Sequence, residues 1–424
     1  MDLNTAIKNS REIIESPFHS FIDLENNFNQ KNAENNFKVD EVGLSKLKDW
    51  YFDESGNFVH NTGRFFKVVK VKNKLVNSGI LLQKEIGTLG VVSCVYDDVL
   101  YILVQFKKEP GNIVSAQLSP TLQATLSNQN KVHGGSAPKY LELFQNLDKK
   151  EILFNAQLPE QGNRYWRKFN NNIVILKDYF EEDENYFWMT LGQVYEFKKF
   201  DNSINSCLRS VLSLITEDVK DRKITTKLSS KIRNFNDRAE IDNSVIEFYS
   251  KKDDELSFKS NNDRFHIKGI SISIQDREVN SWDQPIIYDP YIKEYIILSI
   301  VNKKERKYLL KEYYEPGYEN GFNYGPTAIS KSDISDNSLK EIERLFDKNA
   351  NLKFIQSIEM SEEGGRFLHC KVKHSFYELK TDVSLKFPDN YQLFNMDEIN
   401  SINKNKLLSM EARSLIFFAK NIYN

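Results

Sequence analysis

Small hydroxyl and amide side chains concentrate in residues 109–128, where they offer the groups needed to bind a polar ligand. An apolar run at 99–105 comes before them and predicts a central strand. Pro110 and Gly111 end this strand, because proline lacks a backbone donor and glycine tolerates a left-handed backbone. The Ser, Thr, Asn and Gln side chains that follow suit a polyhydroxylated, phosphate-bearing ligand. A polar surface loop is the structural alternative, and composition alone favours it.

Arginines and tryptophans elsewhere in the chain extend this binding chemistry. Guanidinium groups match phosphate oxygens, and an indole ring can stack on a nucleotide base or flank a sugar. For each arginine, a salt bridge to a nearby glutamate is the alternative role, and for each tryptophan a place in the core. The candidates for the diphosphate are Arg164, Arg209, Arg366 and Arg413, and those for stacking are Trp50 and Trp282.

The sequence lacks the usual motifs of a dinucleotide site, a P-loop or a nucleophile elbow. Its six histidines show no pairing at metal-ligand spacing, and no lysine stands in an evident Schiff-base context. We therefore expect activity without a metal or a cofactor.

Composition narrows the class of protein further. The chain has 424 residues, of which 40% are hydrophobic, and this size suits two domains that each bury a core. A net charge of −2 does not indicate a protein that binds nucleic acid or an acidic membrane surface. The three cysteines lie far apart, and no apolar segment is long enough to span a membrane, so we expect a soluble, cytoplasmic protein.

An internal duplication is the strongest architectural signal. Residues 109–111 and 315–317 both read Glu-Pro-Gly, and residues 120–121 and 326–327 both read Pro-Thr, each pair being 206 positions apart. Further matched landmarks follow in the same order: strand-hairpin patterns at 91–104 and 295–310, helical patterns at 140–144 and 343–346, the strings 160–165 and 362–367, and closing helices at 208–215 and 411–415.

These landmarks divide the chain into four segments. We expect a leader at 1–45 that packs on the first domain, a first repeat at 46–216, a charged, lysine-rich linker at 217–262 and a second repeat at 263–424. Strands and helices alternate within each repeat, so the pattern indicates an α+β fold.

Several strings together resemble the NDP-hexose 2,3-dehydratases, bacterial enzymes of deoxysugar biosynthesis. The resemblance covers nearly the whole chain from Trp50 onward. Its carriers are residues 60–66, 109–112, 117–121, 123–125, 127–128, 133–135, 191–193, 277–279, 282, 284–285, 361–367 and 411–414. The sequence departs from the usual family pattern at Gln129, where tyrosine is common, and at Asn163, where serine is common.

The resemblance implies a fold, a substrate and a reaction. The fold would be two tandem Nudix-hydrolase-like domains with mixed sheets between helices, in a homodimer, although neither half carries the Nudix catalytic box. The substrate would be a 4-keto-6-deoxyhexose on a nucleoside diphosphate, most often dTDP. Loss of water across carbons 2 and 3 would give a 3,4-diketo-2,6-dideoxy sugar without a cofactor. A downstream 3-ketoreductase or aminotransferase would consume this unstable product.

The reaction needs a base, an acid and a partner for the enolate oxygen. His133 is the candidate base or acid and Glu363 the complementary carboxyl group, while Ser127 and Asn128 would hold the hexose or its enolate. A structural histidine is the alternative for His133. The further substrate-binding candidates are Trp50, Thr125, Leu126, Gln129, Asn163, Arg164, Trp282, Gly364, Gly365, Arg366, Glu411 and Arg413.

The two halves differ in these strings, which predicts that one pocket draws from both. We expect residues 125–129 around the hexose, and Gly364, Gly365 and Arg366 near the nucleotide or diphosphate. Two independent pockets, or one pocket inside a single half, remain open. Two other functions also remain open: a non-catalytic protein that binds sugar nucleotides, and an isomerase or epimerase of the same 4-keto sugar.

Overall fold

A computed structural model describes residues 2–72, 77–129, 137–217, 240–241, 254–260, 263–274, 279–303, 305–319, 321–331, 352–381 and 385–423. The first half contains a seven-stranded mixed sheet with the strand order β10-β11-β6-β7-β12, in which β8 also pairs with β7 and β9 with β6. Its strands are β6 (Gly87–Tyr96), β7 (Val99–Lys108), β8 (Ala116–Pro120), β9 (Leu122–Ala124), β10 (Ile152–Pro159), β11 (Phe169–Leu176) and β12 (Tyr186–Thr190).

The second half contains a sheet of the same topology, with the order β21-β22-β17-β18 and with β19, β20 and β23 in the places of β8, β9 and β12. Only β11–β6 and β22–β17 are parallel pairs within these two sheets. The strands are β17 (Lys293–Asn302), β18 (Glu305–Tyr314), β19 (Phe322–Gly325), β20 (Ala328–Lys331), β21 (Leu352–Ser361), β22 (Lys371–Lys380) and β23 (Tyr391–Phe394). The predicted fold class, a tandem duplication with mixed sheets flanked by helices, is therefore confirmed.

The repeated Pro-Thr pair has a structural reason in both halves. The Thr121 hydroxyl accepts the amide of Val92 at 3.0 Å and donates to the carbonyl of Leu103. In the second half, Thr327 accepts the amide of Leu298 at 2.9 Å and donates to Leu309 in the same way. Each threonine thus satisfies backbone groups of the two central strands at the position where the chain returns to the sheet.

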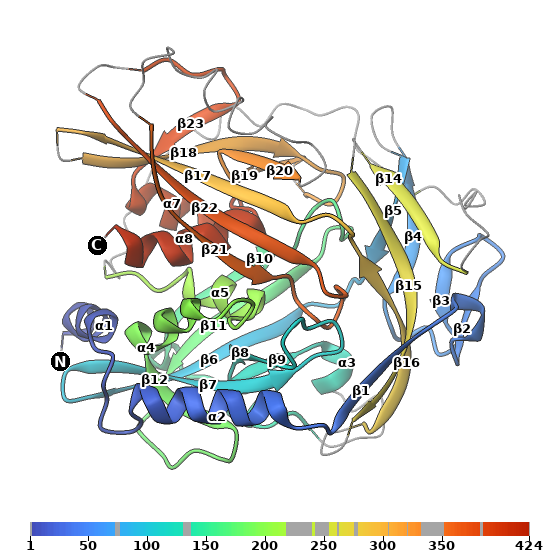
Figure 1. Cartoon of the computed structure of the whole chain (residues 1–424), viewed down its shortest axis with the longest axis horizontal. Coiled ribbons are helices and arrows are strands. Elements are labelled where there is room, and N and C mark those ends of the chain that lie inside the picture. The colour runs from blue at the N-terminus through green and yellow to red at the C-terminus, as the bar shows by residue number, and fades with distance from the viewer. Residues whose placement is uncertain are drawn as a thin grey trace.

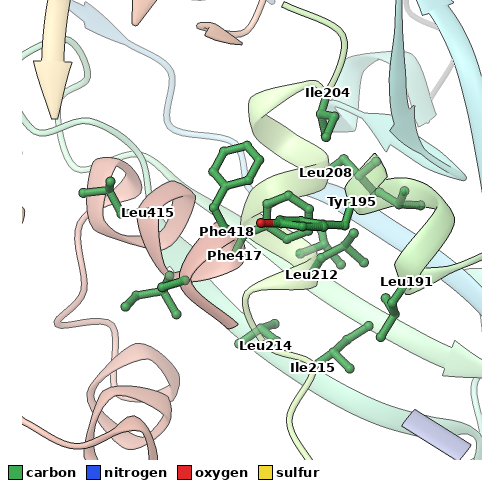
Figure 2. Close-up of a cluster of buried hydrophobic side chains, with 14 of the residues drawn as sticks. Leu191, Tyr195, Ile204, Leu208, Leu212, Leu214, Ile215, Leu415, Phe417 and Phe418 are labelled. Carbon is green, nitrogen blue, oxygen red and sulfur yellow. The ribbon is translucent and has the colours of Figure 1, made fainter. Parts of the chain in front are cut away.

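Among the described residues, helices α4 (Leu191–Glu196), α5 (Ser206–Leu212), α7 (Met396–Lys404) and α8 (Met410–Ile422) pack against the sheets. The side chains of Thr190 and Asn395 form capping boxes at the starts of α4 and α7. Figure 1 shows α5 and α8 between the sheet of the first half and that of the second. Their apolar side chains, with those of α4, meet in one buried cluster (Figure 2), so the two halves share a continuous core.

Two buried arginines make matched contacts across this interface. Arg209 donates from Nε to the Ser414 hydroxyl at 3.1 Å, and Arg413 donates from Nε to the Ser210 hydroxyl at 2.9 Å. Their remaining donors bind backbone carbonyls, at Ile204 and Ser361 for Arg209 and at Leu408 and Pro159 for Arg413. Each guanidinium therefore joins the closing helix of one half to the other half.

Two further sheets cover one side of the molecule (Figure 1). One contains β14 (Leu256–Ser260), β15 (Asp263–Ile274) and β16 (Ser281–Tyr288), and the other β2 (Trp50–Phe52), β3 (Phe58–His60), β4 (Lys67–Lys72), β5 (Asn77–Leu82) and β13 (Glu240–Ile241). The antiparallel pairs β4–β5 and β15–β16 repeat the duplication.

The N-terminal segment contacts both halves. Helices α1 (Leu3–Glu12) and α2 (Phe21–Ala33) bury Ile7, Leu24 and Phe28 in the core that also contains the first sheet, as predicted. The next strand, β1 (Phe37–Val42), instead pairs antiparallel with β15 of the second half. The prediction that this leader packs on the first domain was therefore incomplete, because a strand can pair with any free sheet edge that it reaches.

Helical predictions near the sheets had mixed outcomes. The pattern at 140–144 forms only a short 3-10 helix, η2 (Leu141–Phe144), and its predicted counterpart at 343–346 lies outside the described residues. The polar segment after β9 contains one turn of helix, α3 (Leu126–Gln129). The other short helices are η1 (Leu44–Lys46), η3 (Lys149–Glu151) and η4 (Phe197–Lys199).

Candidate active site

A cavity of about 530 Å³ lies between the two halves, and we call it the main cavity. The first half contributes the Glu109–Pro110 turn, Gln123 to Thr125 and the region from Glu160 to Asn170. The second half contributes residues around Trp282 and the turn from Glu363 to Arg366. Residues of both halves therefore line the cavity.

Crossed turns between the halves hold the cavity together. The amide of Gly111 donates to the carbonyl of Gly364 at 2.7 Å, and the amide of His369 donates to the carbonyl of Gly111 at 2.8 Å. A Cβ atom at position 111 would lie 1.8 Å from the carbonyl oxygen of Phe367, so only glycine permits this approach. The Glu-Pro-Gly turn of the second half makes the matching contact with the first half: the amide of Gly317 donates to the carbonyl of Gly162 at 2.8 Å.

The first crossed turn brings two carboxyl groups to the cavity wall. Glu363 accepts the amide of Gly365 at 2.8 Å and the side-chain amide of Gln123 at 3.0 Å. Glu109 pairs with Lys107 at 2.7 Å. Burial and, next, the negative charge of Glu109 raise the pKa of Glu363 from 4.5 to about 7, although Arg366 acts in the opposite direction. Such a pKa lets one carboxyl group both accept and donate a proton near neutral pH.

Aromatic rings and one guanidinium form another part of the wall. Arg366 lies 4.4 Å above the ring of Phe66 and donates to the carbonyl of Gly365 at 2.8 Å. Within the described part of the chain it makes no ion pair, and its Nε lacks a hydrogen-bond partner. Trp50 donates to the carbonyl of Asp283 at 3.0 Å, and Trp282 to the side chain of Gln284 at 2.9 Å. Both indoles are thus fixed, and the ring of Trp50 already stacks on that of Phe58, with centroids 5.8 Å apart.

A third part of the wall carries Tyr165, Lys168 and Asn170. Lys168 donates to the carbonyl of Glu85, and burial lowers its pKa from 10.5 to about 8. Asn170 donates to Glu160 at 2.5 Å and accepts the amide of Gly87 at 3.2 Å. This wall therefore presents fixed polar groups in a partly desolvated site, where hydrogen bonds are stronger than in water.

The duplication places a second pocket, also lined by residues of both halves, at the equivalent position, but its volume is only about 10 Å³. There Arg164 forms a buried ion pair with Asp289 at 3.0 Å and lies 4.1 Å above the ring of Phe265. Lys293 also binds Asp289, at 3.1 Å, and Tyr295 donates to Glu362 at 2.8 Å. Side chains that bind one another therefore fill the space that is open in the main cavity.

The predicted site residues fall into three groups. The main cavity brings together Glu363, Trp50, Thr125, Trp282, Gly365 and Arg366. The second pocket is lined by Asn163, Arg164 and Glu411. Outside both linings lie Leu126, which is exposed, Gln129, which donates to Thr88 at 3.2 Å, Gly364, whose carbonyl binds Gly111, and Arg413, which is buried between the halves.

His133 lies outside the described residues, and only the backbone is described for Ser127 and Asn128. Their predicted roles, like the other role assignments, stay predictions. Sequence reasoning did not single out Tyr165, Lys168 or Gln123 as site residues. The signal for Tyr165 was present, since it replaces a phenylalanine of the other repeat.

In the described residues, no helix is long and apolar enough to cross a membrane. The same residues contain no group of three or more His, Cys, Asp or Glu side chains placed to hold a metal ion.

Comparison with solved structures finds partial resemblances. A crystal structure of an ADP compounds hydrolase matches with a TM-score of 0.25 and 12% identity, over 37% of this chain and 84% of that one. A Nudix hydrolase from M. Smegmatis matches with a TM-score of 0.23 and 10% identity, over 31% of this chain and 85% of that one.

Comparison of sequences gives matches over most of the chain. A protein of Saccharopolyspora spinosa named dTDP-4-dehydro-6-deoxy-alpha-D-glucopyranose 2,3-dehydratase is 28% identical, over 91% of this chain and 88% of the relative. A protein of Streptomyces violaceoruber with the same name is 27% identical, over 92% and 94% respectively. The family model described as NDP-hexose 2,3-dehydratase matches residues 22–215 and 230–418. With both repeats matched, the chain belongs to the NDP-hexose 2,3-dehydratase family.

Proposed function

We propose that this chain removes water across carbons 2 and 3 of a 4-keto-6-deoxyhexose on a nucleoside diphosphate, with dTDP-4-keto-6-deoxyglucose as the favoured substrate. The observation that carries the proposal is the pair Glu109 and Glu363, which the two halves bring together at one cavity. The names of the relatives support the same substrate. The product is a 3,4-diketo-2,6-dideoxy sugar nucleotide.

In this proposal each part of the substrate meets a different part of the cavity wall. Trp50 and Trp282 offer faces to the base, and Arg366 has guanidinium donors to spare for the diphosphate. The hexose then reaches the wall that carries Glu363 and Thr125. Because Arg164 and Lys293 already pair with Asp289 in the second pocket, we expect one substrate molecule per chain.

Glu363 acts in proton transfer, with His133 as the complementary acid or base. A carboxylate with a pKa of about 7 removes the proton on carbon 3, which the neighbouring 4-keto group makes acidic. The electron pair of that C–H bond forms a double bond between carbons 3 and 4, and the carbon-4 oxygen takes the negative charge. This charge then re-forms the ketone, the electron pair between carbons 3 and 4 moves to form a double bond between carbons 2 and 3, and the hydroxyl on carbon 2 leaves, protonated, as water. The remaining enol takes a proton at carbon 2, loses the proton of its carbon-3 hydroxyl and becomes the diketone. A positioned acid or base contributes ~10²–10⁴-fold to such a step.

The test is incubation of the protein with dTDP-4-keto-6-deoxyglucose and a 3-ketoreductase that traps the product. The expected result is a 2,6-dideoxy sugar nucleotide, with turnover reduced by ~10²-fold or more in Glu363→Gln. Binding without any trapped product would instead support a non-catalytic protein. Deuterium uptake at carbon 3 that leaves the 2-hydroxyl in place would support an isomerase or epimerase.

We also propose that the enzyme works as a homodimer in the cytoplasm, beside a 3-ketoreductase or aminotransferase that consumes its product. The sugar product carries two adjacent carbonyl groups, so rapid onward reduction or amination protects it from degradation. Light scattering of the purified chain tests the dimer directly, and a mass of one chain at micromolar concentration contradicts it.

A further inference from the structure

Tyr165 and Phe367 occupy the same place in the two halves. Tyr165 forms a bridge to Leu81 and Phe367 forms one to Ile287, each in the parallel sense. Their carbonyl groups lie against Gly317 and Gly111 of the opposite crossed turns. The two rings also contact each other, with centroids 6.3 Å apart. Both halves thus place a buried aromatic ring here, and the two rings belong to one hydrophobic cluster.

The hydroxyl group is the only chemical difference between these two side chains, and it occurs on the side of the open cavity. Tyr165 lines the main cavity, whereas Phe367 lines the filled second pocket. The Tyr165 side chain is only 5% exposed. Among the described residues, its hydroxyl has no hydrogen-bond partner. By contrast, the buried hydroxyl of Tyr295 in the second half donates to Glu362. The Tyr165 hydroxyl is not one of the fully buried atoms that lack a partner, so it stays accessible at the main cavity that Tyr165 lines, where a ligand can bind it.

The charges around Tyr165 determine what its hydroxyl can do. Burial and then the neighbouring carboxyl groups of Glu363 and Glu160 raise its pKa well above 10.0. The phenol therefore keeps its proton and serves as a hydrogen-bond donor, but it is a poor acid for a leaving hydroxyl. A neutral donor that does not ionise suits an oxygen on which negative charge develops during the reaction.

We propose that the Tyr165 hydroxyl donates a hydrogen bond to the carbon-4 oxygen of the substrate and stabilises the enolate. This role rests on the proposed dehydration. Glu363 takes the proton from carbon 3, and carbon 4 is the adjacent ring atom, so a donor on the neighbouring wall reaches its oxygen. No proton is transferred by Tyr165 in this step; the electron pair released at carbon 3 moves to the oxygen that the phenol contacts.

Tyr165→Phe tests the role, because it installs the side chain that the fold already uses at position 367. The expected result is a decrease in kcat of ~10²-fold, with KM and the affinity for dTDP changed by less than about twofold. The exchange of the carbon-3 proton with deuterium from solvent, followed by mass spectrometry, should slow by the same factor. Tyr295→Phe is the matched control: it removes a buried hydroxyl from the other half, and kcat should stay at the wild-type value.

Three outcomes would overturn the inference. The first is a Tyr165→Phe enzyme with wild-type kcat. The second is slower loss of water with an unchanged exchange rate at carbon 3, since an enolate donor must affect both. The third is an equal loss of kcat in Tyr295→Phe, which would assign the effect to packing. If the wild-type chain forms no dehydrated product at all, the proposed function itself fails, and that result is visible before any variant is made.

Discussion

The Glu109→Gln substitution should shift the pH dependence of catalysis toward lower pH. The pKa of Glu363 is about 7 rather than 4.5, and burial is the largest cause, followed by the charge of Glu109. Since Glu109 is the smaller contribution, its removal should lower this pKa by less than half of the shift, on the order of one pH unit. Glutamine keeps the size of the side chain and removes only the charge.

The assay is kcat/KM against pH from 5 to 9, which reports the ionisation of the free enzyme. Glu363 must be ionised to act as a base, so activity should rise with pH through its pKa. That rise should occur about one pH unit lower in Glu109→Gln. Glu315→Gln is the control, because Glu315 occupies the same position in the other half and does not line the main cavity. An unchanged profile in Glu109→Gln, or the same displacement in Glu315→Gln, would refute the role of the carboxyl pair.

Four further results are expected. Burial raises the pKa of Glu315 to about 8, so between pH 4.5 and 8 the native state keeps a proton that the unfolded state has lost. The free energy of unfolding, measured by urea titration, should therefore fall as pH rises across this range. Glu315→Gln should make this pH dependence weaker. Gly111→Ala and Gly317→Ala should both lower the melting temperature and turnover, because the added Cβ atoms would lie 1.8 Å from the carbonyl oxygens of Phe367 and of the cavity residue Tyr165 respectively. Arg366→Ala should weaken dTDP binding by about tenfold in isothermal titration, and unchanged affinity would exclude it from the diphosphate site. Dialysis against a chelator should leave turnover intact, and a loss that a divalent ion restores would contradict the metal-free mechanism.

Repeated short strings were sufficient to predict the duplication. Glu-Pro-Gly and Pro-Thr recur because their backbone and hydroxyl groups make the same contacts in both copies: Gly111 and Gly317 permit the crossed turns, and Thr121 and Thr327 join the central strands. Each of these contacts requires a particular residue type at its position, so the repeat can be recognised in the sequence. Strand β1 left none, because its pairing with β15 joins positions more than 200 residues apart and needs only backbone groups.

The choice among the four arginines depended on partners that sequence spacing does not display. Arg209 and Arg413 bind serines and carbonyls between the halves. An arginine in the sequence does not indicate by itself that it has such a structural role. Arg164 and Arg366 occupy the same position in the two repeats and both lie over a phenylalanine ring. No property of either arginine alone separates the two.

The difference lies in the strand that each arginine faces. The bridge at Ile287 in the second half matches the bridge at Leu81 in the first. Asp289 lies two residues after Ile287 and pairs with Arg164. Gln83 lies two residues after Leu81 and carries no charge. A buried guanidinium with a carboxylate partner is already neutralised, and a diphosphate could replace that partner only by leaving the carboxylate unpaired. The guanidinium opposite Gln83 keeps its charge for a ligand. Cavity and charge therefore agree: the arginine without an internal carboxylate partner is the one that lines the main cavity.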